Sequence, residues 1–292
     1  MPAERVPNPP ARPVLLDHPP TSHEVSAWPF ETRGGRRYRL FAAVPAKSPP
    51  DTGWPALYLL DGNAAFAALG AGDLARHRDL AIVAVGYETE HSFDFDARSR
   101  DYTPAAPSGR GLPADSPRPL RPSGEAAQFL AALTEEVIPG VERRFLLDAR
   151  RRTLWGHSYG GLFALYAYAR VPGAFGGICA ASPSLWWGGG MILDLIAATP
   201  QLERRPALLL TRGGQESSPA TDAAAAGAAF ARLQQILGAR GIAPPVHALE
   251  SAGHRDALEA SLRLALRFAA RLQASVSPAG QKNRKLWLDK YE

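Results

Sequence analysis

Cysteine is almost absent from this chain, which has one among 292 residues. A single thiol excludes a disulfide framework and a zinc centre built on several cysteines. No uninterrupted apolar run reaches the 18 or so residues that a membrane span needs. The N-terminal stretch also lacks the continuous apolar segment of a secretory signal peptide. We therefore expect a cytoplasmic protein, or a periplasmic one if an export signal has been removed.

Acidic residues are in a small deficit, with 28 Asp and Glu against 33 Lys and Arg, for a net charge of +5. The basic residues are spread along the chain without an aromatic–basic module motif, so we do not expect nucleic-acid binding. A mildly positive protein would instead favour an anionic small substrate.

The two ends differ from the rest of the sequence. Residues 1–22 contain seven prolines, which predicts a flexible lead-in. Three of the four lysines fall within residues 276–292, and we interpret this tail as an extension that expression cloning could have added. The folded domain is assigned to residues 23–275.

Short apolar runs alternate with helical patterns through the domain. Two strand-like stretches around Gly34-Gly35, 25–32 and 37–44, predict a hairpin. Further strands are predicted at 56–62, 80–87, 153–155, 177–181, 207–211 and 246–249, and helices at 64–77, 125–145, 158–170, 222–239 and 257–272. This alternation predicts an α/β protein with a mostly parallel sheet, helices on both faces and an N-terminal antiparallel hairpin.

One segment breaks the alternation. Residues 88–124 hold six prolines and three glycines and show no sustained period. They predict a long loop, and loops of that length inside a domain are usually functional or disordered.

The clearest chemical signal is Gly156-His157-Ser158-Tyr159-Gly160, a G-x-S-x-G sequence between a short strand and a helix. In that context the serine lies on a sharp, strained turn with its hydroxyl exposed beside the positive end of a helix. We expect Cβ atoms at Gly156 and Gly160 to collide with neighbouring backbone. Ser158 is therefore the candidate nucleophile.

A serine hydroxyl needs a base, and His254 follows a late strand, where the chain order Ser…acid…His places it. His157 adjoins the nucleophile, but we expect its side chain to point away from the hydroxyl. The acid should follow the strand at 207–211. Glu216 lies five residues past that strand and is preferred. Asp222 is the alternative, and it ranks second because a carboxylate in the first turn of the following helix is also favoured by the helix dipole.

An oxyanion hole needs two preorganised N–H groups. One should be that of Tyr159, directly after the nucleophile. The second should come from the loop Asp61-Gly62-Asn63, where we choose the Asn63 N–H and expect Gly62 to allow a close backbone approach. Asp61 is interpreted as a turn-former without a catalytic role.

Four stretches together resemble a known family: LYLLDGNAAF, FDFDARSRDYTP, GHSYGGLFAL and ASPSLWW. They are similar to the putative-esterase branch of the α/β-hydrolase fold, and within it to siderophore esterases that open enterobactin-type and salmochelin trilactones. The similarity runs from about residue 25 to about residue 272. It implies Ser158 as nucleophile, His254 as base and the 61–63 loop as part of the oxyanion hole, while in some of these esterases no acidic third member is evident.

The resemblance also implies an anionic ferric catecholate as substrate. Arg98 and Arg100 in the long loop are candidate contacts for it. Trp186 and Trp187 follow a strand on the side where such sheets bind ligands, so one of them could stack on a catechol ring or both could be core. No metal-ligand spacing or cofactor motif is present, so iron would arrive with the substrate. Cys179 is expected to be an inert core residue.

These observations predict a serine esterase that works through an acyl-enzyme, with activity rising through a pKa of about 6–7 as the imidazole base becomes neutral. Two alternatives stay open. One is a general carboxylesterase or S-formylglutathione hydrolase-like thioesterase. The other is a siderophore-binding protein without catalysis, which would need neither the serine turn nor the late histidine.

Overall fold

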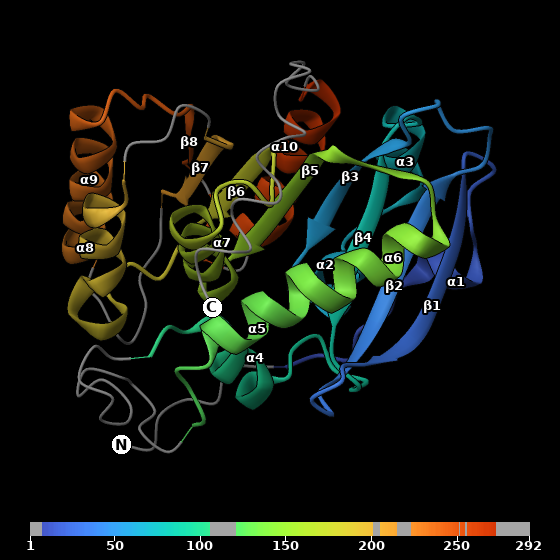
Figure 1. The fold of residues 1–292 in the computed structure, drawn as a ribbon, viewed down its shortest axis with the longest axis horizontal. Helices are drawn as coiled ribbons and strands as arrows, with labels where there is room; N and C mark the ends of the chain where they lie inside the picture. The colour runs from blue at the N-terminus through green and yellow to red at the C-terminus, as the bar shows by residue number, and fades with distance from the viewer. Residues whose placement is uncertain are drawn as a thin grey trace.

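A single mixed sheet forms the centre of the molecule. The computed structural model describes residues 8–105, 121–200, 205–214, 223–250, 252–254 and 256–272. Within these, eight strands lie in the order β1-β2-β4-β3-β5-β6-β7-β8 (Figure 1). Their bounds are β1 His23–Glu31, β2 Arg37–Pro45, β3 Trp54–Leu59, β4 Ala81–Gly86, β5 Leu147–His157, β6 Gly177–Ala181, β7 Ala207–Gly213 and β8 Val246–Leu249.

The strand directions confirm the predicted arrangement. β1 and β2 form an antiparallel hairpin, with His23 opposite Pro45 and Glu31 opposite Arg37, and β2 is also antiparallel to β4. All the remaining neighbours, from β4 across to β8, are parallel. β3 and β4 are buried along their whole length, which is why their sequences are continuous apolar runs.

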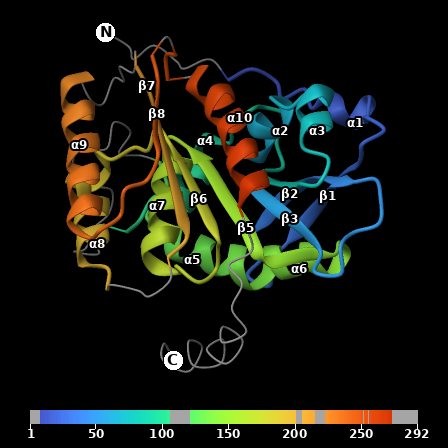
Figure 2. The same ribbon diagram turned by 90° about the horizontal axis from the view of Figure 1, so that it is seen from above.

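Helices cover both faces of the sheet (Figure 2). One face packs against α1 (Val14–Asp17), α2 (Gly62–Ala67), α3 (Ala71–Arg76) and α10 (Asp256–Arg271). The other packs against α4 (Phe95–Tyr102), α5 (Ala126–Ala131), a π-helical segment (Ala132–Val137), α6 (Ile138–Arg144), α7 (Tyr159–Arg170), α8 (Met191–Ala198) and α9 (Ala223–Ala239). Each face thus has its own apolar core. Within the described residues, no helix has both the length and the apolarity to cross a bilayer.

Two local expectations were wrong. The single helix expected at 64–77 is two short helices that break around Gly70. The segment 88–124 is not loop throughout, because α4 lies inside it; residues 106–120 lie outside the described residues. In the proline-rich lead-in, which is described from residue 8 onward, the Asn8 side chain exchanges hydrogen bonds with the main chain of Phe93, and Leu15 is buried.

The strand order fixes where a site can form. The chain leaves β3 toward β4 and then returns to place β5 on the other side of β3. At such a reversal the loops that follow the two adjacent strands separate to opposite faces and leave a crevice at the carboxyl ends. The loops after β3 and β5 contain Asp61–Asn63 and Ser158.

Candidate active site

Ser158 occupies the turn between β5 and α7, where its backbone takes φ 60° and ψ −116°. Non-glycine residues rarely adopt this region, and its strain is typical of nucleophile turns. The Ser158 N–H donates to the Ala181 carbonyl oxygen at 2.9 Å, which ties the turn to the end of β6. The Oγ atoms of Ser158 and Ser184 lie 3.4 Å apart, so a second hydroxyl adjoins the candidate nucleophile.

Close backbone contacts explain two of the glycines around this turn. A Cβ atom on Gly156 would lie 2.2 Å from the Gly160 carbonyl oxygen, as expected for a residue that must be glycine. The expectation for Gly160 was wrong, because a Cβ there would meet Leu60 at an ordinary 3.5 Å. The second sterically required glycine is Gly161, whose Cβ would lie 2.6 Å from the Ala181 carbonyl oxygen.

His254 lies on the loop after β8, at the same carboxyl edge of the sheet as Ser158. A hydrogen bond from the Ala252 N–H to the Leu249 carbonyl oxygen, 2.9 Å long, turns the chain there. The His254 ring packs on the ring of His157, with centroids 4.6 Å apart and planes at 44°. The structure therefore brings the candidate base against the residue that directly precedes the candidate nucleophile.

His157 is the support for this loop rather than a competing base. Its ring is buried and hydrogen-bonds to the main chain of His254. Burial, reinforced by the positive charges of His254 and Arg98, holds the pKa of His157 well below its ordinary value of 6.5. His157 is consequently neutral at physiological pH, so it adds no charge beside the base.

The loop after β3 lies beside the serine turn. The Leu60 N–H donates to the Trp155 carbonyl oxygen at 3.0 Å, and a Cβ on Gly62 would lie 2.6 Å from the Gly86 nitrogen. The Asn63 side chain fixes this loop on the end of β4: its Oδ1 accepts from the Tyr87 N–H at 2.8 Å, and its Nδ2 donates to the carbonyl oxygens of Tyr87 and Thr89. Gly62 therefore allows the close approach expected of it.

The two N–H groups chosen for the oxyanion hole both belong to first turns of helices. Asn63 is in the first turn of α2, and Tyr159 is the first residue of α7. N–H groups at these positions have no acceptor within their own helix, so they can serve an anionic oxygen. Their assignment as oxyanion donors stays a prediction that the adjacency of the two loops supports.

Asp61 has a larger part than a turn-former. It takes φ 50° and ψ 49° ahead of α2, and its N–H donates to the Tyr102 hydroxyl at 2.9 Å. Its carboxylate accepts two hydrogen bonds from Arg98, from Nε at 2.8 Å and from Nη2 at 2.9 Å. This bidentate pair is almost completely buried and anchors α4 to the loop after β3.

The environment of Arg98 differs from that of a free substrate contact. Its guanidinium lies over the rings of Phe93, Tyr102 and Tyr159 at 5.2–5.8 Å from their centroids. With its Nε and Nη2 donating to Asp61, the side chain is committed to holding the loop. A direct contact of Arg98 with substrate stays a prediction.

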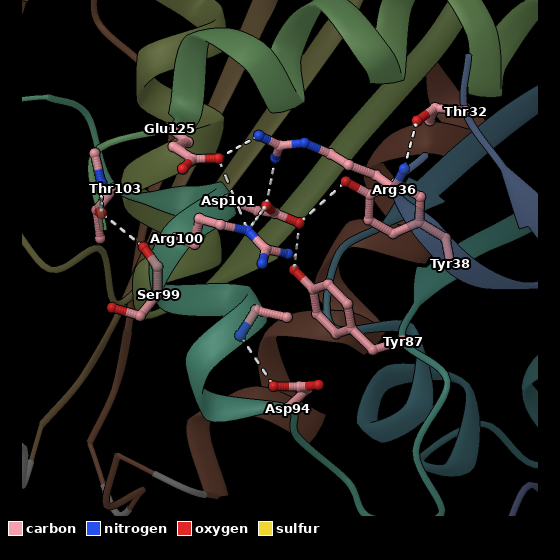
Figure 3. Close-up of polar contacts among 12 residues, drawn as sticks. Thr32, Arg36, Tyr38, Tyr87, Asp94, Ser99, Arg100, Asp101, Thr103 and Glu125 are labelled. Atoms are coloured by element: carbon pink, nitrogen blue, oxygen red, sulfur yellow. Dashed lines mark hydrogen bonds and ion pairs between the residues drawn. The ribbon is translucent and has the colours of Figure 1, made fainter. Parts of the chain in front are cut away.

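Arg100 belongs to a neighbouring charge network centred on Asp101 (Figure 3). Asp101 is fully buried and accepts from Arg36 Nη1 at 2.8 Å, Arg100 Nε at 3.1 Å and the hydroxyls of Tyr38 and Tyr87 at 3.1 and 3.3 Å. Arg36 also pairs with Glu125. Burial raises the pKa of Asp101, and the two arginines offset only part of that rise.

The two adjacent tryptophans have different surroundings. Trp187 is 1% exposed, and its indole N–H donates to the Pro104 carbonyl oxygen, so it is a core residue. Trp186 is half-buried and lines a hollow together with Arg212 and Phe230. Contact of Trp186 with a ligand stays a prediction.

Glu216 and Asp222, the two candidates for the acid, both lie outside the described residues. Among the residues that are described, no cluster of His, Cys, Asp or Glu has the arrangement of a metal site. Cys179 is buried on β6, and burial raises the pKa of its thiol well above the ordinary value.

Sequence reasoning did not identify Ser184 or Arg212, and it did not predict that His157 packs on His254. Ser184 carries a weak signal, because it lies in the ASPSLWW stretch that follows a buried strand. Arg212 directly follows the buried run of β7, which is where polar residues at a carboxyl edge are expected.

Comparison with known proteins decides the family. The family model described as "Putative esterase" matches residues 32–240. This chain belongs to that esterase family. The apo-salmochelin esterase of Escherichia coli O6:H1 is 34% identical over 88% of this chain and 82% of its own length. The ferri-bacillibactin esterase BesA of Bacillus subtilis is 31% identical over 80% of this chain and 85% of its own length.

Solved structures agree with the family assignment. The esterase superimposes on the enterobactin hydrolase IroE in complex with DFP with a TM-score of 0.74 and 32% identity, covering 88% of this chain and 99% of the other. The predicted α/β-hydrolase fold is confirmed, and so is the prediction of an ester hydrolase. The resemblance noted in the sequence is confirmed as well.

Proposed function

We propose that this esterase hydrolyses the backbone ester bonds of a catecholate siderophore of the enterobactin type. The observation that carries the proposal is the set of relatives at 31–34% identity over most of the chain, whose names specify salmochelin, bacillibactin and enterobactin esterases. The net charge of +5 suits an anionic substrate of this kind.

The proposed chemistry starts at Ser158. Its Oγ attacks the ester carbonyl carbon while His254 takes the hydroxyl proton. The carbonyl oxygen becomes an anion held by the N–H groups of Asn63 and Tyr159. Collapse of this intermediate breaks the C–O bond, and His254 returns the proton to the departing alcohol.

Water completes the cycle. It attacks the acyl-enzyme carbonyl, gives a proton to His254, and releases the carboxylic acid as Ser158 recovers its proton. The net reaction consumes one water per ester bond. A ferric ion, where the siderophore carries one, is part of the substrate.

Product analysis tests the proposal. The purified protein is incubated with an enterobactin-type trilactone in its ferric and iron-free forms, and the linear products are separated by mass spectrometry. We expect stepwise appearance of linear trimer, dimer and monomer, and none with Ser158→Ala. Thermal unfolding of the variant shows whether it is folded.

Two outcomes would overturn the proposal and identify an alternative. Fast hydrolysis of S-formylglutathione or a neutral short-chain ester, with no trilactone turnover, would indicate a general esterase or thioesterase. Tight siderophore binding without turnover, equal in the wild type and Ser158→Ala, would indicate a binding protein.

A further inference from the structure

Ser184 places a buried hydroxyl against the candidate nucleophile. The residue lies in the loop after β6, is 5% exposed, and has its Oγ 3.4 Å from the Oγ of Ser158. Among the residues that the structure describes, Ser158 is the only hydrogen-bond partner of this hydroxyl. Removing a hydroxyl from water costs free energy that only a hydrogen bond offsets. The contact with Ser158 is therefore the interaction that this side chain is placed to make.

The loop that carries Ser184 is held by its main chain. The Ser158 N–H donates to the Ala181 carbonyl oxygen at 2.9 Å, and the Ser184 N–H donates to the Ser158 carbonyl oxygen at 3.2 Å. The Ser184 carbonyl oxygen accepts from the Trp187 N–H, also at 3.2 Å. None of these bonds uses the Ser184 hydroxyl. Its removal would therefore leave in place the main-chain bonds that join this loop to the nucleophile turn.

The direction of the hydrogen bond follows from the proposed chemistry. The Ser158 proton goes to His254, so the Ser184 hydroxyl is the donor and the Ser158 Oγ is the acceptor. A distance of 3.4 Å is long for two hydroxyls, but catalytic hydrogen bonds are often long before substrate binds and shorten in the reacting complex. A neutral donor at this position stabilises negative charge on Oγ without bringing a charge of its own.

The Ser158 Oγ changes as an acceptor during the reaction. In the acyl-enzyme it is an ester oxygen, which accepts hydrogen bonds poorly because its lone pair is delocalised into the carbonyl group. When water has added and the C–Oγ bond breaks, the bonding pair goes to Oγ, which is negative until His254 returns the proton. A donor beside Oγ therefore binds this transition state more strongly than the acyl-enzyme, and that difference accelerates deacylation. Acylation starts from the free hydroxyl, which already accepts the bond, so it gains little.

We propose that Ser184 is a further catalytic residue, whose hydroxyl donates a hydrogen bond to the Ser158 Oγ while the acyl-enzyme is hydrolysed. The Ser184 proton stays on its own oxygen throughout, so the bonds that form and break are those of the reaction described above. The proposal deepens the proposed function, because it rests on an acyl-enzyme at Ser158. It does not depend on which ester the protein hydrolyses.

Kinetics with 4-nitrophenyl acetate separate the two half-reactions. Release of nitrophenolate reports acylation, and intact-protein mass spectrometry of rapidly quenched samples follows formation and loss of the acetyl-enzyme. Ser184→Ala should lower the rate constant of deacylation by about 10–100-fold, and it should change kcat/KM, which reports acylation, by less than about twofold. With deacylation limiting, kcat and KM fall together, and the acetyl-enzyme accumulates to a larger fraction than in the wild type.

Two further variants isolate the hydroxyl. Ser184→Thr keeps a hydroxyl at this position and should recover part of the deacylation rate. Ser261→Ala is the matched control, because Ser261 is 1% exposed and its hydroxyl donates to the Leu258 carbonyl oxygen within α10 at 2.9 Å. Both half-reactions of Ser261→Ala should proceed at the wild-type rates. Thermal unfolding of each variant shows whether it is folded.

A purely structural role for Ser184 would give a different result. A displaced Ser158 would lower kcat/KM and the deacylation rate by similar factors, and that outcome would overturn the proposal. A wild-type deacylation rate in Ser184→Ala would also overturn it. Absence of trilactone turnover, with the effect of Ser184→Ala on 4-nitrophenyl acetate intact, would refute only the proposed substrate. Trilactone turnover with unaltered deacylation in Ser184→Ala would refute only the role of Ser184.

Discussion

His157 adjoins the candidate nucleophile and supports the candidate base without adding a positive charge. It packs on His254 and hydrogen-bonds to its main chain from a buried position. A charged imidazolium there would repel the protonated base that forms during catalysis. The fold therefore supports the proposed base, His254, with a second histidine, and burial keeps that second histidine neutral.

Buried histidines predict that the protein loses stability in acid. Burial lowers the pKa of both His157 and His23 below the ordinary value of 6.5. As pH falls through 6.5, the unfolded chain takes up protons at these positions that the native state does not, so the free energy of unfolding falls. Above pH 6.5 the two histidines are neutral in both the folded and the unfolded state, so their contribution to the free energy of unfolding is fully present.

Urea unfolding at about pH 7.5 and about pH 5.5 measures this dependence. His23→Gln and His157→Gln should each show a smaller loss of stability between the two pH values than the wild type. His91→Gln, at an exposed position, should show the wild-type loss. An equal loss in all four proteins would contradict the assignment.

At the scale of elements, the turn from β5 to α7 depends on a backbone approach that only glycine permits. Gly156→Ala would place a methyl group 2.2 Å from the Gly160 carbonyl oxygen. The backbone must shift, so we expect a loss of about 1–3 kcal/mol in unfolding free energy. We also expect a fall of about 100-fold in kcat, because a small displacement of a nucleophile is costly.

Gly173→Ala is the control for this variant, since a Cβ atom there would meet nothing within 4 Å. Its stability and activity should match the wild type. Full activity in Gly156→Ala would show that the turn tolerates a wider geometry than the structure indicates.

The Asp101 network joins elements that are distant in the sequence. It connects the start of β2 and the residue before α5 to α4. Through Tyr87 it also reaches the end of β4, where the Asn63 side chain is hydrogen-bonded. Asp101→Ala would remove a shared buried acceptor from two arginines and two tyrosine hydroxyls. We expect the free energy of unfolding to fall by about 2–4 kcal/mol, with a smaller loss for Asp101→Asn.

Asp79→Ala serves as the comparison, because Asp79 forms a largely exposed ion pair with Lys47. Its loss should be no more than about 0.5 kcal/mol. Chemical denaturation of the three variants measures these losses. If Asp101→Ala lowered the free energy of unfolding no more than Asp79→Ala does, the stabilising role of the network would be refuted.

The sequence predicted most strands and missed α4 for one physical reason. Strands such as β3, β4 and β6 are buried on both faces and read as apolar runs. α4 instead buries polar side chains, Arg98, Ser99 and Asp101, so its core-facing residues show no apolar period. Its partners are far away in the chain, as the pair between Arg98 and Asp61 shows, and local patterns cannot specify such pairings.

The residues of the candidate site also differ in whether the sequence alone predicts them. Ser158 and His254 could be placed from a local motif and from chain order, and the structure brings both to one edge of the sheet. The hollow around Arg212 could not be predicted, because it is formed by the ends of β6 and β7 together with α9, whose side chains meet only after the sheet is assembled.

At the scale of the whole molecule, the net charge of +5 predicts salt-sensitive turnover of anionic substrates. The Debye length shortens from about 10 Å at about 0.1 M salt to about 3 Å at about 1 M, so long-range attraction of an anion is lost. Over that range kcat/KM for a ferric siderophore should fall several-fold, while the rate for a neutral short-chain ester stays nearly constant. Equal salt effects on both substrates would contradict a role for the protein's charge.

The central claim is that the hydroxyl of Ser158, with its proton taken by His254, forms the covalent intermediate. Brief reaction with DFP, followed by peptide mass spectrometry of the wild type, Ser158→Ala, Ser184→Ala and His254→Ala, tests it most directly. We predict a label on Ser158 alone, wild-type labelling in Ser184→Ala, no label in Ser158→Ala, and labelling slowed at least about 100-fold in His254→Ala. A label on Ser184, or undiminished ester hydrolysis by Ser158→Ala, would contradict the account.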